Sequence, residues 1–180
     1  MSHHLTAGGS QTNILKLNYR EESFESLRAS NTKINTSSNT KMKTKIKVTE
    51  LEHGELVDLL STALYGSTWF DASYNKEVYE SLTNTTGECF EDKLADMLIN
   101  GHKITITDLE AEGESYSKKF VKFEGKYQNA VYEVELNDFL KVASTKKGFR
   151  LLEDVLSGEG DYYTADAFLQ RVVFGEEVYG

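Results

Sequence analysis

The sequence predicts an α+β fold in which a small antiparallel sheet packs against three to four helices. Three observations lead to this prediction. The 180 residues are 39% hydrophobic and 11% aromatic, which is enough apolar material for a packed core. Helical and alternating patterns are interspersed without the strict strand–helix alternation of a parallel sheet. The candidate strands also lack the long Val and Ile runs that are typical of strands buried on both faces.

The charge divides the chain into two parts. Residues 1–50 hold eight Lys and Arg against four Asp and Glu, a net charge of +4, whereas residues 51–180 hold twelve against twenty-five, a net charge of −13. The first part is rich in Ser, Thr, Asn and Lys, a composition typical of disordered segments. We therefore expect a flexible basic arm over residues 1–41, with a weak strand pattern at 13–20, and one folded domain over residues 42–180.

The first half of the domain carries two helix patterns and two strand patterns. A basic alternating stretch predicts a strand at 43–48, and residues 68–74 predict a short strand or loop. Thr49 and Glu52 have capping-box spacing, so we expect a helix that starts there and ends at Gly66. A second helix is predicted over 87–99, because four apolar residues recur at helical spacing. These are Phe90, Leu94, Met97 and Leu98.

The second half continues the mixed pattern. Residues 103–109 alternate, with Ile104 and Ile106 on one face, and predict a strand. A strand pair is expected at 120–123 and 130–136, joined by a turn at Gly125. Asn137 can cap a helix that runs to about 147, and a short helix over 150–156 is ended by Gly158. The last predicted helix covers 164–174, with Asp161 or Thr164 as its cap and Gly175 as its end, and a short tail follows over 176–180.

Composition excludes several classes of function. A net charge of −9 argues against general DNA binding and against an anionic membrane surface. The longest apolar runs are far shorter than a membrane span, the N-terminus lacks the apolar stretch of a signal peptide, and a single cysteine fits a reducing compartment. No phosphate-loop, dinucleotide, zinc or nucleophile-elbow motif occurs. We therefore predict no cofactor, no metal and no catalytic set.

An acidic series over residues 108–114 is the first candidate site. It comprises Asp108, Glu110, Glu112 and Glu114. In an extended chain, alternate residues share one face, so the four carboxylates would form a ladder. Such a ladder is compatible with a solvated strand end, with mimicry of nucleic-acid phosphates in a basic groove of a partner, or with a Mg²⁺ or Ca²⁺ site.

Two further groups of residues are candidates for partner contact. Glu91, Asp92 and Asp96 are predicted on the outer face of helix 87–99, although acidic residues in a first helical turn are also explained by the helix dipole. Trp69, Tyr162 and Tyr163 are aromatic residues of the kind enriched in interface hot spots, although core packing explains such residues as well.

A nucleophile and base could be supplied by Cys89 and His102. No glycine-rich loop that would stabilise an oxyanion accompanies this pair, so a buried, inert cysteine is the expected outcome.

Four strings of the chain resemble a known group of proteins. They are LLSTALYGS at 59–67, CFEDKLA at 89–95, LING at 98–101 and FGEEVYG at 174–180. As a set they resemble small proteins carried by phages and mobile elements of Firmicutes, some of which are anti-CRISPR proteins. The resemblance covers about 45–180, excludes the N-terminal arm, and maps no catalytic residue onto this chain.

The resemblance implies an inhibitor in the cytoplasm of a bacterial host. Its partner would be a type II CRISPR effector nuclease, an RNA-guided enzyme, or the complex of that nuclease with its guide RNA. Two alternatives stay open. One is a nuclease-type enzyme that truncates guide RNA, suggested by the carboxylates of 108–114 together with Lys118, Lys119 and Lys122. The other is a non-enzymatic regulatory or structural phage protein.

Overall fold

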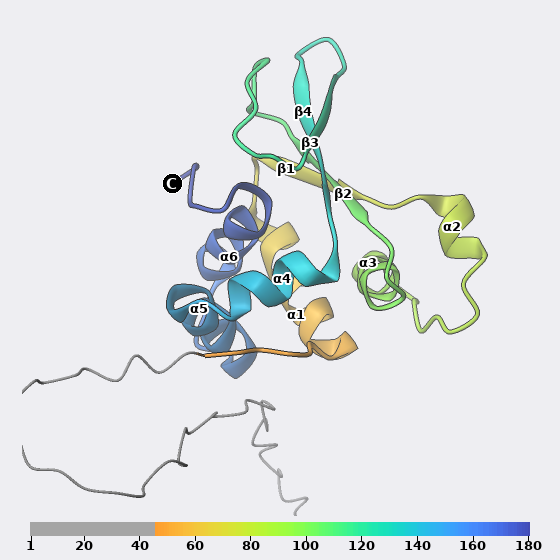
Figure 1. The fold of residues 1–180 in the computed structure, drawn as a ribbon, viewed down its shortest axis with the longest axis vertical. Coiled ribbons are helices and arrows are strands. Elements are labelled where there is room, and N and C mark those ends of the chain that lie inside the picture. The colour runs from red at the N-terminus through yellow and green to blue at the C-terminus, as the bar shows by residue number, and fades with distance from the viewer. Residues whose placement is uncertain (1–45) are drawn as a thin grey trace, which may run out of the picture.

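The computed structural model describes residues 46–180 and confirms the predicted α+β fold (Figure 1). The predicted arm over 1–41 and the strand pattern at 13–20 lie outside the described residues. Within residues 46–180 there are six helices and four strands, where three to four helices were expected. In chain order they are α1 (His53–Gly66), β1 (Phe70–Ser73), α2 (Lys76–Glu80), α3 (Phe90–Ile99), β2 (Ile104–Asp108), β3 (Phe120–Glu124), β4 (Asn129–Val134), α4 (Leu136–Ala143), α5 (Lys146–Ser157) and α6 (Tyr162–Phe174).

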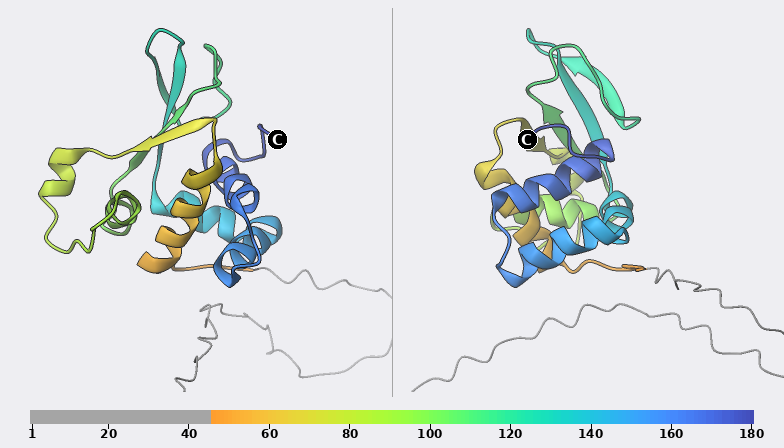
Figure 2. Two further views of the ribbon diagram at one scale, coloured as in Figure 1. Left: turned by 180° about the vertical axis from the view of Figure 1, so that it is seen from behind. Right: turned by 90° about the vertical axis from the view of Figure 1, so that its left-hand side faces the viewer.

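The four strands form one antiparallel sheet in the order β1-β2-β4-β3. In β2, Ile104 and Ile106 are fully buried while Thr105 and Thr107 are half-buried, as the alternating pattern predicted. The predicted pair of β3 and β4 is also confirmed, and Gly125 takes the positive φ of 73° that its turn requires. Figures 1 and 2 show this hairpin projecting away from the helices.

The helices enclose the core together with the sheet. Helix α1 packs against α3, α5 and α6, while α4 packs against α5 and α6; α6 contacts β4, and α3 contacts β2. Figure 2 shows α1, α4, α5 and α6 gathered at the end of the sheet opposite the hairpin. Fully buried Leu, Ile and Phe side chains fill the space between them, and each such side chain contributes about 1.5–3 kcal/mol by leaving water.

Helix α1 begins later than the sequence predicted. Its N-cap is Glu52, which forms a capping box with Glu55, so Thr49 is not the cap. The chain before it is held extended across the helices, because Val48 and Leu51 are buried and the Val48 backbone N–H donates to Ser144 Oγ at 2.9 Å. This contact joins residues 96 positions apart, and local spacing could not reveal it.

The predicted helix over 137–147 is two helices. Helix α4 is capped by Glu135 instead of Asn137, and the chain breaks after Ala143. Thr145 then caps α5 by accepting the Gly148 N–H at 3.0 Å. The last helix follows the prediction closely, since Asp161 caps α6 and Gly175 ends it with a φ of 91°.

Candidate binding site

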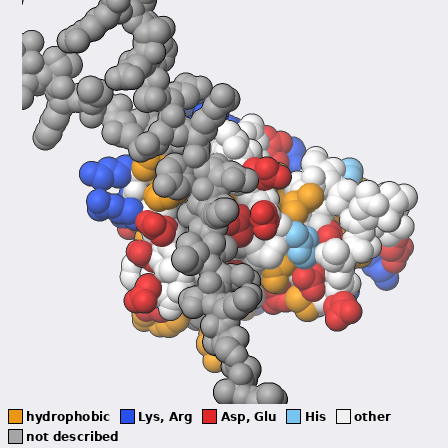
Figure 3. Space-filling view, turned by 90° about the horizontal axis from the view of Figure 1, so that it is seen from below, with side chains coloured by type: hydrophobic (Ala, Val, Ile, Leu, Met, Phe, Trp, Pro, Cys, Tyr) orange, Lys and Arg blue, Asp and Glu red, His pale blue; other side chains and the backbone are white. Residues whose placement is uncertain are grey.

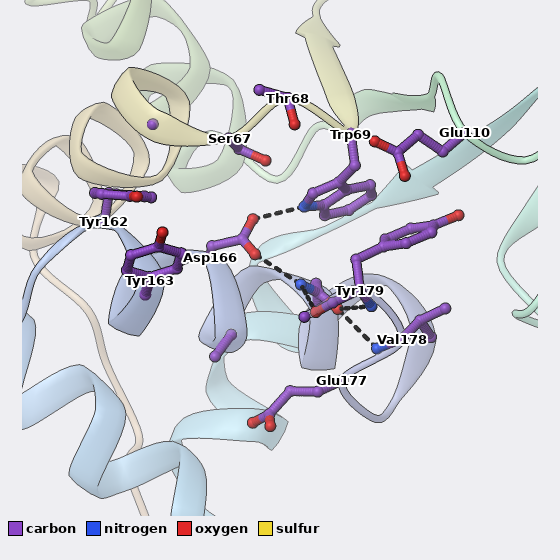
Figure 4. Close-up of a pocket in the computed structure, with 14 residues that line it drawn as sticks. Ser67, Thr68, Trp69, Glu110, Tyr162, Tyr163, Asp166, Glu177, Val178 and Tyr179 are labelled. Atoms are coloured by element: carbon purple, nitrogen blue, oxygen red, sulfur yellow. Dashed lines mark hydrogen bonds between the residues drawn. The ribbon is translucent and has the colours of Figure 1, made fainter.

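A pocket of about 490 Å³ lies where the end of α1, the segment between α1 and β1, one side of α6 and residues 177–180 meet (Figure 4). Three of the predicted aromatic residues and one of the predicted acidic residues line it. The lining residues are Gly66, Ser67, Thr68, Trp69, Glu110, Tyr162, Tyr163, Asp166, Ala167, Gln170, Glu177, Val178, Tyr179 and Gly180. No Lys, Arg or His is among these lining residues of the described chain.

Asp166 is the central polar group of this pocket. Its Oδ1 accepts the indole N–H of Trp69 at 2.6 Å, and its Oδ2 accepts an amide N–H of Gln170 at 2.6 Å. Figure 4 shows Asp166 between the Tyr162–Tyr163 pair and the Trp69–Tyr179 pair. Hydrogen bonds to an ionised acceptor are the strong ones in proteins, so these two fix the orientation of the carboxylate.

Gln170 holds residues 178–179 against α6. Its Oε1 accepts the backbone N–H groups of Val178 and Tyr179 at 2.7 and 2.8 Å, and its Nε2 donates to the Tyr179 carbonyl at 2.9 Å. Gln170 is itself buried, so these partners satisfy an amide that would otherwise be costly to remove from water. The predicted short tail is therefore a packed part of the pocket wall.

Glu177 is fixed beside the same wall by two cations. It contacts Lys147 Nζ at 2.6 Å and Arg171 Nε at 3.0 Å. The hydrogen bond from Lys147, followed by the bond from Arg171, holds the pKa of the Glu177 carboxyl below its usual range, although partial burial opposes this.

Tyr179 connects the pocket to the sheet. Its ring lies 5.3 Å from that of Trp69, and its hydroxyl donates to Asp108 Oδ2 at 2.8 Å. Asp108 is fully buried and also accepts the Glu110 backbone N–H at 3.0 Å. The prediction that Asp108 belongs to an exposed acidic ladder is therefore wrong, because the end of β2 carries it into the core beneath Tyr179.

Burial raises the pKa of the Asp108 carboxyl, while the hydrogen bonds from Tyr179 and Glu110 oppose the rise. Burial, followed by the bond to Asp108, raises the pKa of the Tyr179 hydroxyl. A raised pKa in the folded state means that folding favours the protonated carboxyl. This contribution to stability is complete below the unfolded-state pKa of about 3.9 and is lost as pH rises through the folded-state pKa.

We expect Asp108→Asn to remove this pH dependence. The Asn oxygen can accept the Glu110 N–H, and its amide can donate to the Tyr179 hydroxyl. Relative to the parent chain, the variant should gain unfolding free energy as pH rises from about 4 to about 8, measured by urea unfolding at each pH. Asp71→Asn, at an exposed position of β1, controls for the loss of one negative charge. A parent-to-variant difference that stays constant with pH would contradict this account.

The other members of the predicted ladder do not share one face. The chain turns after β2, where the backbone N–H of Glu114 donates to the Ala111 carbonyl at 2.8 Å and Glu112 takes a positive φ of 46°. Glu110, Glu112 and Glu114 are all exposed, but only Glu110 lines the pocket. The extended course that a ladder requires is therefore interrupted by turns at 109–110 and 112–113, with Ala111 buried between them.

Tyr162 and Tyr163 open α6 at the rim of the pocket. Their ring centroids are 3.9 Å apart, and the Tyr163 side chain is 65% exposed. The hydrogen bond with Tyr163, followed by partial desolvation, raises the pKa of Tyr162 to about 12. Tyr162 packs directly on Gly66, where any Cβ would overlap its ring. The absence of a side chain at Gly66 therefore lets α1 and α6 meet and shape one side of the pocket.

The prediction that Asp96 lies on an outer, acidic face of α3 is wrong. Asp96 is 3% exposed and accepts the backbone N–H groups of Thr86 and Gly87, both at 3.0 Å, while His53 Nε2 lies 3.2 Å away. Asp96 therefore fastens the loop before α3 instead of facing solvent. Glu91 and Asp92 are half-buried, and α3 begins at Phe90, three residues after the predicted start.

Cys89 differs from its expected state. It is exposed, and its thiol donates to Asp92 Oδ2 at 3.1 Å, while Asp92 also accepts the Cys89 backbone N–H at 3.1 Å. Both contacts belong to the N-terminal cap of α3. The cysteine is therefore part of a helix cap instead of a buried core residue.

Ten of the fourteen lining residues were not predicted from the sequence, and Ser67, Asp166, Gln170 and Tyr179 are the polar ones among them that matter most for the site. The sequence does indicate that Asp166 and Gln170 are neighbours, because they are spaced i, i+4 beside the apolar face of α6. Ser67 and Tyr179 gave no such signal. In contrast, Glu110 and the three predicted aromatic residues are brought together as pocket-lining residues.

The chain is an α+β domain whose pocket is lined by acidic and aromatic side chains. Comparisons of the chain with protein-family models, with curated proteins and with solved structures find no match. Among residues 46–180, no group of three or more His, Cys, Asp and Glu side chains is arranged to hold a metal ion. No helix in the same range combines the length and apolar character of a membrane span.

Proposed function

We propose that this protein is a binding inhibitor that occupies a basic surface of a type II RNA-guided nuclease, or of its complex with guide RNA, in a bacterial cytoplasm. The observation that carries the proposal is the pocket itself, in which carboxylates and tyrosines meet and no basic side chain is among the lining residues of the described chain. The exposed Glu112 and Glu114 extend the negative charge beyond Glu110.

Electrostatics supports a basic partner. Residues 51–180 carry a net charge of −13, and Figure 3 shows acidic side chains spread over one face, with basic side chains toward the edges of the view. Channels that bind nucleic acid are lined with Lys and Arg, and the Coulomb attraction that draws phosphates into such channels also draws carboxylates. An acidic domain can therefore compete with nucleic acid for the same surface.

The position of the resemblance strings also supports this choice of partner. The string at 59–67 ends α1 and supplies Gly66 and Ser67 to the pocket, and the string at 174–180 supplies the wall around Tyr179. The strings at 89–95 and 98–101 belong to α3 and the turn after it. Two of the four strings therefore border the site that we propose for partner contact.

The nuclease-type alternative gains no support from the arrangement of its residues. Lys119 lies 3.7 Å from Asp138, and Lys122 lies 3.4 Å from Glu124, so both ammonium groups pair outside the 108–114 segment. Asp108 is buried away from the exposed glutamates. The experiment below separates inhibition by binding from this alternative and from that of a regulatory or structural phage protein.

We expect the full chain to form a complex with a type II nuclease, alone or loaded with guide RNA, in size-exclusion chromatography. The complex should weaken as salt rises from about 50 to about 500 mM, because exposed charges are screened over shorter distances. Reversing Glu110, Glu112 and Glu114 to Lys should lower the affinity by about tenfold or more, which corresponds to about 1.4 kcal/mol. The thermal midpoint should change little, because all three side chains are exposed.

A matched control makes the same charge change elsewhere. Glu77 and Glu80 are exposed on α2, and Glu88 is exposed just before α3. None of the three lines the pocket, so their reversal to Lys should leave affinity close to that of the parent chain. If the two triple variants lost the same affinity, the loss would be explained by the change in net charge, which would argue against this site. No complex with any nuclease tested would overturn the proposal, and truncated guide RNA after incubation would replace it with the enzymatic alternative.

A further inference from the structure

We propose that the pocket binds the guanidinium group of an arginine side chain that the partner protein inserts. This inference rests on the proposed function, because it names the chemical group of a basic partner that the site recognises. Three features of the pocket point to arginine: its negative charge, its free hydrogen-bond acceptors and an exposed aromatic ring at its rim.

The free negative charge of the pocket comes from two residues. Glu177 lines the pocket but is already paired with Lys147 and Arg171. Asp166 receives only neutral donors, from Trp69 and Gln170, so its charge is uncompensated among the described residues that hydrogen-bond to it. Glu110 is exposed at the rim and makes no ion pair within residues 46–180. A ligand for this pocket should therefore carry positive charge.

The pocket also has hydrogen-bond acceptors that a ligand N–H group can use. Each oxygen of Asp166 accepts one hydrogen bond and can accept a second. Ser67 also lines the pocket, and its hydroxyl oxygen is buried with no hydrogen-bond partner in residues 46–180. A buried polar atom without a partner is costly, but solvent does not reach this oxygen, so the two Asp166 oxygens are the acceptors that a ligand would use. A quaternary ammonium has no N–H to donate, whereas a guanidinium has five.

The aromatic rim selects a planar cation. Tyr163 is 65% exposed and stacks on Tyr162, so one tyrosine pair borders the pocket with a ring available to solvent. Figure 4 shows this pair beside Asp166. A guanidinium stacks on an aromatic ring while its N–H groups bind a carboxylate at its edge, a combination that the compact ammonium of lysine does not offer. Arginine therefore fits the ring and the carboxylate together.

The test uses the full chain and three capped peptides, Gly-Ser-Xaa-Ser-Gly, in which Xaa is arginine, lysine or citrulline. Trp69 is the single tryptophan, and its indole N–H donates to Asp166, so one indole signal in a ¹H–¹⁵N spectrum reports on the site. We expect the arginine peptide to shift this signal with a dissociation constant of about 1 mM. The lysine peptide should bind several-fold more weakly, and the neutral citrulline peptide should produce no saturable shift.

Paired variants separate the site from general effects. Tyr163→Ala and Glu110→Gln should each weaken binding of the arginine peptide by about three-fold or more, corresponding to at least about 0.6 kcal/mol. Tyr127→Ala removes another exposed tyrosine, in the β3–β4 turn, and Glu153→Gln removes an exposed carboxylate of α5 that does not line the pocket. Both controls should bind the peptide as the parent chain does.

The outcomes distinguish this inference from the proposed function. No saturable shift with arginine up to about 20 mM, or equal binding of the citrulline peptide, would overturn the arginine site even if a nuclease complex forms. Arginine-selective binding without any nuclease complex would instead keep the site and overturn the choice of partner.

Discussion

Replacing Gln170 with Ala should lower the free energy of unfolding by about 2–4 kcal/mol. The buried Gln170 amide makes four hydrogen bonds, with Asp166, the Val178 N–H, the Tyr179 N–H and the Tyr179 carbonyl. Removing it leaves these groups without their partner and releases residues 176–180 from α6. Each lost hydrogen bond costs about 0.5–1.5 kcal/mol, and the one to the Asp166 carboxylate lies toward the upper end.

Urea unfolding followed by tryptophan fluorescence measures this change. Trp69 is 4% exposed, and Tyr179 stacks beside it, so release of Tyr179 should also shift the folded-state emission to longer wavelength. Glu153→Ala, at an exposed position of α5, is the control and should change the unfolding free energy by less than about 0.5 kcal/mol. A loss below about 1 kcal/mol for the Gln170 variant, with an unchanged spectrum, would show that the segment is held mainly by other contacts.

Gly66→Ala should destabilise the protein by about 1–3 kcal/mol, the usual range for an overpacked contact. The added Cβ would lie 2.7 Å from Tyr162 Cβ and closer still to the ring, so α1 and α6 would have to separate. Helix propensity alone predicts the opposite sign, because Ala is favoured over Gly in a helix by about 0.5–1 kcal/mol. The sign of the change therefore decides between close packing and propensity.

Gly54→Ala provides the matched comparison in the same helix. A Cβ at Gly54 meets nothing within 4 Å, so this substitution should be neutral or stabilise by up to about 1 kcal/mol. Both variants can be compared by urea unfolding of the full chain. Equal effects for Gly54 and Gly66 would mean that Tyr162 moves aside freely and that the contact between α1 and α6 does not depend on a glycine.

The sequence predicts elements well where their determinants are local. The alternation of Ile104 and Ile106 identifies β2, and Asp161 and Gly175 mark the two ends of α6, because capping depends on residues within one turn. The start of α1 is missed because Ser144, from a distant part of the chain, holds Val48 extended. Spacing within a segment contains no information about such a partner.

The same distinction applies to the site. Trp69, Tyr162 and Tyr163 are recognisable as candidates by residue type, and the pocket contains all three. Asp96 and Asp108 are misplaced because a carboxylate can be buried when donors surround it, and their donors come from other segments. The Tyr179 hydroxyl that binds Asp108 is 71 residues away in the sequence, so only the folded chain brings the two groups together.

Long-range contacts also have a consequence for how the protein folds during synthesis. Val48 binds Ser144, Trp69 binds Asp166, and α1 packs on α6, so the first elements of the domain are completed by the last ones. A topology with a high contact order folds slowly, because distant segments must meet before their contacts stabilise anything. The part of the apolar face of α1 that packs on α6 should therefore stay uncovered on the ribosome until α6 has emerged, a stage at which nascent chains are prone to aggregate.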